Sequence, residues 1–147
     1  MPTVDKVDRL IAQYHQALDE FVRGNPEPVK NLFSRRDDVI FANPLVGLPA
    51  NGWEQVAKAL EHASSQFGEG SEIVGIENVR KYVTPELAYI MEIERAKAKV
   101  SGREDFAPFA LRVTMIFRPE EDGTWKVVHR HADSITSPQP AESVIQQ

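Results

Sequence analysis

Apolar residues recur at intervals of three and four in the N-terminal part of the chain, which is the spacing of amphipathic helices. The first stretch predicts a helix over residues 4–23, which Thr3 can cap and Gly24 can end. A short second helix follows Pro26 and runs to about residue 33, because proline is tolerated in a first turn. Asn51 caps a third predicted helix, whose apolar stripe consists of Trp53, Val56, Ala57, Leu60, Ala63, Ser64 and Phe67.

From residue 72 onward the pattern changes to the alternation that is typical of strands. We predict strands over residues 72–83, 87–99, 106–118 and 124–135, after one short strand at 38–42. Helices followed by hairpin-linked strands indicate the α+β class, with three helices packed on one face of a curved antiparallel sheet. The predicted domain covers residues 1–135, and residues 136–147 are expected to form a flexible tail.

The predicted strand 106–118 is apolar on both faces. Phe109 and Met115 belong to one alternating set, and Ala110 and Ile116 belong to the other. A sheet that is apolar on the face away from its helices needs a cover. We therefore expect a homodimer that forms through the sheet.

The last predicted strand carries the residues with the clearest chemistry. Alternation places one set on one face, Trp125, Val127, His129, His131 and Asp133, and the other set, Lys126, Val128, Arg130 and Ala132, on the opposite face. The first set would give a histidine–carboxylate site for acid–base chemistry, and the second an arginine-lined site for an anion. Both faces mix polar and apolar residues, so the pattern alone leaves both registers open.

Composition removes several classes of function. A net charge of −5 without a basic cluster argues against nucleic acid as a partner. No apolar run approaches the length of a membrane span, and the N-terminus lacks the pattern of a signal peptide, so we expect a cytoplasmic protein. The absence of cysteine excludes disulfides and thiolate sites, and we expect neither a metal nor another cofactor.

The order of predicted elements resembles the NTF2-like superfamily. The segments Asn31–Ser34, Asp38–Gly47 and Gly52-Trp53 are similar to SnoaL-like and ketosteroid-isomerase-like members. Ala88–Ile93 and Asp122–His131 also resemble the association domain of calcium/calmodulin-dependent protein kinase. The resemblance implies a cone-shaped domain with a pocket between the helices and the concave face of the sheet, and dimerisation through the sheet.

The resemblance also implies which residues line that pocket. It places Arg130 inside, with Arg112 as its neighbour and with Phe41, Asn43, Trp53, Tyr89 and Met91 around them. It places His129, His131 and Asp133 on the convex side. Glu92 and Glu94 are expected on the outer face, although in the opposite register either would be the best general base. Ketosteroid isomerases carry their aspartate base where this chain has Asn43, which argues against that activity.

Three hypotheses follow for the function. The first is the binding of a small, partly apolar molecule, either neutral or anionic, that Arg130 and Arg112 anchor. The second is a proton-transfer enzyme of the SnoaL-like kind, an isomerase, cyclase or hydratase. Its base would be His131, oriented by Asp133, with Tyr89 or Asn43 as hydrogen-bond donor and His129 as a further candidate. The third is an oligomerisation module whose pocket has no ligand.

Overall fold

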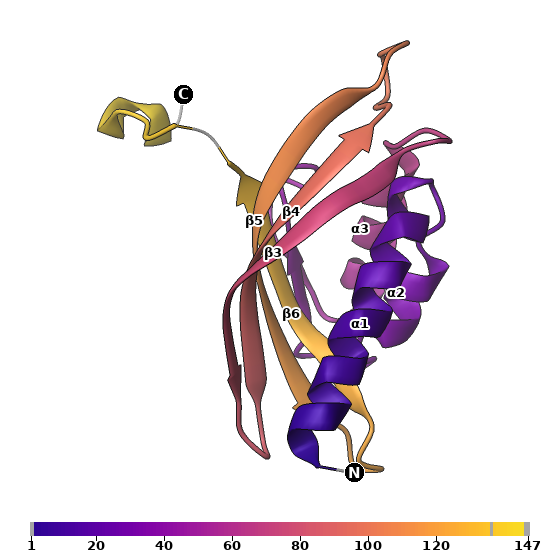
Figure 1. Ribbon diagram of the computed structural model, residues 1–147, viewed down its shortest axis with the longest axis vertical. Coiled ribbons are helices and arrows are strands. Elements are labelled where there is room, and N and C mark those ends of the chain that lie inside the picture. Colours follow the sequence, from indigo (N-terminus) through magenta and orange to yellow (C-terminus); the bar gives the residue numbers. More distant parts are fainter. Residues whose placement is uncertain (1, 136, 146–147) are drawn as a thin grey trace.

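The helices and the strands form two layers in the computed structural model, which describes residues 2–135 and 137–145 (Figure 1). Helices α1 (Thr3–Val22), α2 (Glu27–Leu32) and α3 (Trp53–Ser65) pack on the concave face of the sheet. Strands β3 (Glu72–Val83), β4 (Ala88–Ala98), β5 (Ala107–Pro119) and β6 (Trp125–Ser134) make most of that sheet. The predicted α+β class is confirmed, and the four long strands begin and end within one residue of the predicted positions.

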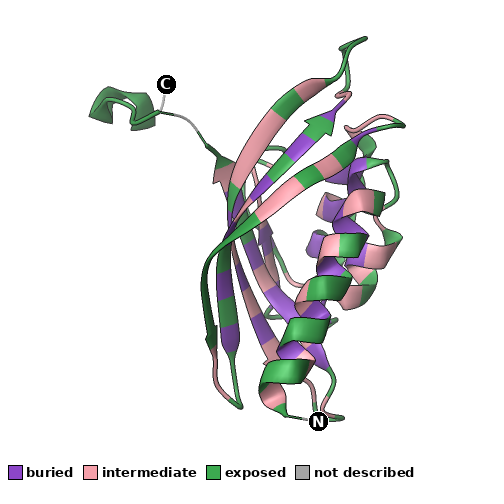
Figure 2. Ribbon diagram, viewed as in Figure 1, coloured by how far each residue is buried: buried purple, intermediate pink, exposed green. Residues whose placement is uncertain are grey.

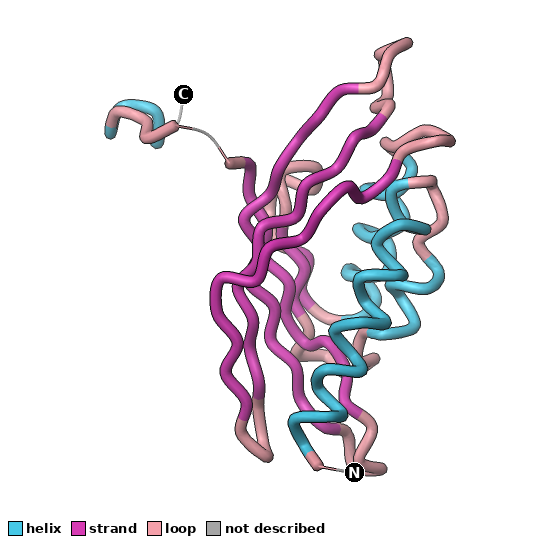
Figure 3. Tube along the Cα trace, in the orientation of Figure 1, coloured by secondary structure: helices cyan, strands magenta, loops and turns pink. Residues whose placement is uncertain are grey.

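The sheet is mixed, whereas the sequence predicted an antiparallel one. Its strand order is β2-β1-β6-β5-β4-β3, with the short strands β1 (Ile40–Ala42) and β2 (Ala50–Asn51) at one edge. Strand β1 runs parallel to β6, so that Phe41 lies opposite Arg130. Between β1 and β6 the chain passes through β2, α3 and the antiparallel strands β3, β4 and β5. Figure 3 shows the helices on one side of the strands.

The ends of two helices differ from the prediction. Pro2 precedes α1, so Thr3 is its first residue rather than its cap. Asn51 belongs to β2, and Gly52 precedes α3 with a φ of 85°, a backbone conformation that glycine adopts without strain. The predicted stop of α1 is confirmed, because Gly24 follows the helix with a φ of 98° and its N–H is bonded to the carbonyl of Phe21.

Two hydrogen bonds that involve side chains hold the C-terminal half of α1, one to the sheet and one to the neighbouring helix α3. The carboxylate of Asp19 accepts the backbone N–H of Ile73 at 2.9 Å, which fixes the start of β3 against the helix. The hydroxyl of Ser64 donates to the carbonyl of Phe21 at 2.7 Å and joins α3 to α1. Buried residues occur in α1 and α3 and in the strands β4, β5 and β6, whereas β3 has none (Figure 2).

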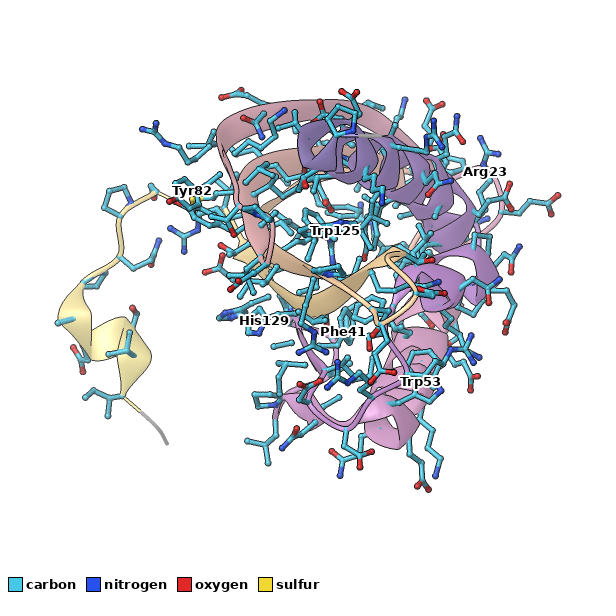
Figure 4. All side chains as sticks on the ribbon, turned by 90° about the horizontal axis from the view of Figure 1, so that it is seen from below. Arg23, Phe41, Trp53, Tyr82, Trp125 and His129 are labelled. Atoms are coloured by element: carbon cyan, nitrogen blue, oxygen red, sulfur yellow. The ribbon has the colours of Figure 1, made fainter. Side chains whose placement is uncertain are left out.

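A bulge in β6 changes which of its side chains face the helices. Ile116 pairs with His129, whereas the next residue, Phe117, pairs with Val127, so Val128 is an extra residue. Trp125 and Val127 therefore point into the core, together with Arg130 beyond the bulge. The prediction that Trp125 and Val127 share a face with the histidines was wrong, because strict alternation does not continue through a bulge. Figure 4 shows Trp125 inside the domain and His129 outside it.

The described part of the tail leaves β6 on the side of the sheet away from the helices (Figure 1). It contains one short 3₁₀ helix, Ala141–Val144. Residue 136 and residues 146–147, which belong to the predicted tail, lie outside the described residues. No helix in the described part of the chain is both long enough and apolar enough to cross a membrane.

Candidate functional site

A cavity of about 240 Å³ lies between α1, α3, the loop after β1 and the concave face of the sheet. Its wall is mostly apolar, and its polar side chains are Tyr14, Asn43, Glu94, Arg130 and Ser134. The apolar part consists of Leu18, Phe21, Val22, Phe41, Pro44, Leu45, Leu60, Phe67, Ile73, Ala96, Val100, Phe109 and Leu111. A concave, mainly apolar wall with a few polar groups is the usual form of a small-molecule site.

An ion pair between Arg130 and Glu94 forms the charged part of the wall. Nη1 and Nη2 of Arg130 donate to Oε2 and Oε1 of Glu94 at 2.9 and 2.7 Å. Both side chains are buried, with relative exposures of 5% for Arg130 and 3% for Glu94. The pair joins β6 to β4 across β5, and Sδ of Met115 on β5 lies 3.5 Å from the guanidinium. Two parallel hydrogen bonds fix both the distance and the orientation of these groups.

Tyr14 completes this polar region from the helix side. It is buried on α1, and the guanidinium of Arg130 lies 5.5 Å from the centre of its ring. Burial is the main reason that the pKa of Tyr14 lies far above its ordinary value. The phenol therefore keeps its proton at neutral pH and can donate a hydrogen bond into the cavity.

Burial alone would raise the pKa of Glu94, but the charge and hydrogen bonds of Arg130 outweigh that effect and hold it below its ordinary value. Burial likewise lowers the pKa of Arg130, and the nearby carboxylates more than compensate for it. Both groups are consequently charged at neutral pH. The guanidinium and the carboxylate cancel each other, so this part of the wall is polar without carrying a net charge.

A second carboxyl group, that of Glu92, lies beside this pair. Glu92 is buried, and its Oε1 lies 2.9 Å from Nε2 of His15. Its Oε2 has no hydrogen-bond partner among the described residues. Burial raises the pKa of Glu92 to about 7, helped by the negative charge of Glu94 and opposed by His15. Glu92 is thus the one carboxyl at this site that changes its charge near neutral pH.

The predicted pocket residues are divided between the two faces of the sheet. Phe41, Asn43 and Arg130 line the cavity. Tyr89 and Met91 lie on the outer face of β4, with relative exposures of 37% and 38%, so the prediction for both was wrong.

Arg112 and Trp53 also lie outside the cavity, contrary to the prediction. Arg112 is on the outer face of β5 and binds both carboxylate oxygens of Asp133. Trp53, the first residue of α3, has the guanidinium of Arg35 at 4.3 Å from its ring. The face of β5 that carries Arg112 is opposite to the face that carries Met115, which is why Arg112 cannot be a neighbour of Arg130.

The predicted histidine–carboxylate set lies on the convex face, as the resemblance implied. His129 is half-buried there, and burial, together with His131, lowers its pKa. His131 is exposed, and Asp133 is occupied by Arg112. The described residues contain no group of three or more side chains that could hold a metal ion. These three residues therefore cannot act on a molecule inside the cavity.

Sequence reasoning placed Glu92 and Glu94 on the outer face, and this was wrong. Both alternating sets of β4 contain apolar residues, so the period of two did not decide the register. One signal was present in the chain: a buried arginine needs a carboxylate, and Glu92 and Glu94 are the only acids in the residues of β4. Combining that requirement with the inward position of Arg130 would have selected the observed register.

We expect the buried ion pair to be essential for folding. Glu94→Gln should lower the free energy of unfolding by about 3–5 kcal/mol, because it leaves the charge of Arg130 buried without a partner. Asp133→Asn is the matched control, since it removes the carboxylate from an arginine pair on the exposed face and should have a much smaller effect. Urea unfolding measures both variants. Equal losses of unfolding free energy in the two variants would show that burial does not control the strength of an arginine–carboxylate pair.

Glu92 should make stability depend on pH. Its pKa of about 7 in the folded chain exceeds the ordinary value of 4.5, so between these values the folded state binds more protons than the unfolded state. Its contribution to stability therefore falls as pH rises through this window, by up to about 3 kcal/mol. Glu92→Gln should remove this loss, so the difference in unfolding free energy between variant and wild type should grow from pH 5 to pH 8.

The control for this measurement is Glu121→Gln, which changes an exposed carboxyl in the turn before β6. The pH dependence of the difference from wild type should be much larger for Glu92→Gln than for this exposed variant. A constant difference for Glu92→Gln would mean that Glu92 is ionised throughout.

Comparison with known proteins gives the family. The sequence model of the SnoaL-like domain family matches residues 7–137 of this chain. The search of curated proteins found no match.

Similar solved structures share the fold at low sequence identity. An NTF2-like superfamily protein from Salmonella enterica has a TM-score of 0.75 at 16% identity, covering 94% of each chain. A ketosteroid isomerase-like protein from Erwinia carotovora has a TM-score of 0.71 at 15% identity, covering 88% of this chain and 93% of its own. A candidate calcium/calmodulin-dependent protein kinase type II association domain from Thiobacillus denitrificans has a TM-score of 0.68 at 19% identity, covering 88% and 94%. Because the family model matches most of this chain, the chain belongs to the SnoaL-like domain family, and it has an NTF2-like fold.

Proposed function

We propose that this protein binds a small, largely apolar and uncharged molecule in the cavity between its helices and sheet. The observation that carries the proposal is the gathering of Tyr14, Glu94 and Arg130 in one part of an otherwise apolar wall. The apolar wall favours the body of a ligand by removing it from water. The polar groups favour one hydrogen-bonding substituent and fix its direction.

The ion pair that Arg130 already forms with Glu94 argues for an uncharged ligand. The sequence favoured an anion held by Arg112 and Arg130, but Arg112 lies on the other face and Arg130 already binds Glu94. An anion would have to displace the Glu94 carboxylate or lie beside it, and either arrangement leaves negative charge uncompensated in a buried site. A hydroxyl or carbonyl group does not meet that cost, because Tyr14 can donate to it and Glu94 can accept from a hydroxyl.

The cavity volume limits the size of the ligand. Its volume of about 240 Å³ exceeds the roughly 150 Å³ of an apolar cavity that holds benzene. It lies below the roughly 300 Å³ at which pockets for drug-sized molecules begin. A single substituted ring or a short branched chain therefore suits the cavity.

We expect small neutral compounds to raise the melting temperature and charged ones of equal size to have little effect. The probes are p-cresol and cyclohexanone, with benzoate as the anion of matched size. A ligand at 100 times its Kd stabilises the folded state by about 2.7 kcal/mol, which thermal unfolding detects easily. Stabilisation by benzoate alone would contradict the proposal of an uncharged ligand.

Two alanines on neighbouring strands provide the matched variants for this experiment. Ala96 on β4 lines the cavity, and Ala110 on β5 points from the outer face. Ala96→Phe should fill the cavity and abolish the shift caused by p-cresol, whereas Ala110→Phe should keep it. Loss of the shift in both variants, or in neither, would place binding elsewhere.

A proton-transfer enzyme is the second candidate, and one observation favours it. Glu94, which is ionised, and Tyr14, which keeps its proton, face the same cavity. A carboxylate that takes a proton beside a carbonyl, and a phenol that stabilises the resulting enolate, are the two groups such a reaction needs. These residues replace His131 and Asp133 in the roles of base and partner, because those two lie on the outer face.

Exchange of the α-hydrogens of cyclohexanone in D₂O, followed by proton NMR, tests this second candidate. Wild type should accelerate the exchange, and Tyr14→Phe should reduce the acceleration by about 100-fold, because it removes the hydrogen-bond donor for the enolate. Tyr82→Phe, which changes a tyrosine on the exposed part of β3, is the control and should leave the rate unchanged. An equal rate in wild type and Tyr14→Phe would contradict the assigned role.

We also propose the homodimer that the sequence predicted. The outer face of the sheet supports it, because Tyr82 and Tyr89 stack there with ring centres 5.7 Å apart and Met91 is partly exposed beside them. Sedimentation equilibrium distinguishes a dimer from a single chain. A mass of one chain at all concentrations would contradict the homodimer.

A further inference from the structure

We propose that Glu92 and His15 form a path by which the polar wall of the cavity exchanges a proton with solvent. This inference rests on the proposed function, because it gives the cavity a route for protons that does not require a bound molecule to leave. It assigns roles to two residues outside the cavity wall, since neither Glu92 nor His15 is among the lining side chains.

The geometry connects solvent to the cavity in three steps. The side chain of His15 on α1 has a relative exposure of 31%, so it contacts water. Its Nε2 lies 2.9 Å from Oε1 of the buried Glu92, which is hydrogen-bonding distance. Glu92 and Glu94 are two residues apart on β4, so both point to the inner face, and Glu94 lines the cavity. A continuous series of groups thus leads from solvent to the cavity: the exposed imidazole of His15, the buried carboxyl of Glu92 and the carboxylate of Glu94.

The charges around Glu92 favour its neutral form. Arg130 is the nearest buried cation, and it donates two hydrogen bonds to Glu94 rather than to Glu92. Tyr14 contributes no positive charge, and the residues opposite Glu92 on β3 and β5 are Asn78 and Val113. The other charged groups of α1 and β3 on the inner side already have partners: Lys81 with Asp8, and Asp19 with the N–H of Ile73.

The unsatisfied oxygen of Glu92 supports the same conclusion. A buried carboxylate oxygen without a donor costs free energy, and Oε2 of Glu92 is such an atom when the group is ionised. A proton on Oε1 of Glu92, shared with Nε2 of His15, makes the group a neutral acid, and a neutral oxygen without a donor costs less free energy on burial than a carboxylate oxygen. The oxygen without a partner therefore favours the protonated state of Glu92.

The path consists of three proton transfers, each of which balances: between His15 and water, between Glu92 and His15, and between Glu92 and Glu94. When Glu92 loses its proton, the O–H bond breaks and an N–H bond forms at Nε2 of His15, which gives a carboxylate and an imidazolium. The imidazolium then releases a proton to water and returns to neutral imidazole. The reverse sequence reloads Glu92 after it has passed its proton to Glu94, for which the O–H bond of Glu92 breaks and an O–H bond forms on Glu94.

Carbon-13 NMR of protein labelled at the glutamate carboxyl carbon tests the protonation step. One resonance should titrate near neutral pH, be absent in Glu92→Gln and change its titration in His15→Gln. The second variant identifies the resonance even if Glu92→Gln does not fold. Titration of every glutamate below pH 6 would overturn the inference.

The role of His15 is tested by the rate of deprotonation after a pH jump, followed by the infrared band of the neutral carboxyl group. His15→Gln keeps a polar side chain next to Glu92 but cannot carry the proton, so the rate should fall by about 100-fold or more. His62→Gln, which changes an exposed histidine on α3, is the matched control and should keep the wild-type rate. An unchanged rate in His15→Gln would overturn the path.

These measurements require no ligand, so they separate this inference from the proposed function. A Glu92 carboxyl that exchanges through His15 in a protein that binds neither p-cresol nor cyclohexanone would contradict the binding proposal alone. Binding of p-cresol in a protein whose deprotonation rate is the same with and without His15 would contradict the proton path alone.

Discussion

The buried ion pair of Arg130 and Glu94 constrains the whole interior of this domain. Arginine cannot be discharged inside a protein, so its burial requires a carboxylate at the right distance and angle. Because β4 and β6 are separated by β5, the pair is satisfied only when all three strands keep their register. The bulge at Val128 contributes to this register, since it turns Arg130 to the inner face together with Trp125.

A purely structural role does not account well for this pair. Apolar residues of similar volume are often as stabilising as a buried ion pair, because charges lose their hydration on burial. Here the pair also lines a cavity, where it adds polarity without adding net charge. The same pairing engages Arg130 with Glu94, so that burial, together with the negative charge of Glu94, raises the pKa of Glu92. The ion pair therefore sets the polarity of the wall and contributes to the protonation of the carboxyl behind it.

The fold was predictable from the chain because its elements are long and strongly periodic. The apolar stripe of α1 contains enough repeats to identify the helix without tertiary information. The candidate site was less predictable because it depends on register. A bulge at a single residue of β6 reversed the face of Trp125, and β4 has apolar residues in both of its alternating sets. Contacts with residues on distant strands determine which face of a strand points to the helices, and local periodicity contains no information about those contacts.

Similarity of fold does not assign the chemistry of this cavity. The solved structures that resemble the chain share 15–19% of its residues in the compared examples, which supports a common backbone and little more. The polar wall depends on Tyr14, Glu94 and Arg130, which lie on three different elements and are far apart in the sequence. Substitution at any one of these positions changes the charge or the hydrogen bonds of the wall. The identity of these three side chains, together with Glu92 behind them, is therefore the feature from which the activity of this chain has to be argued.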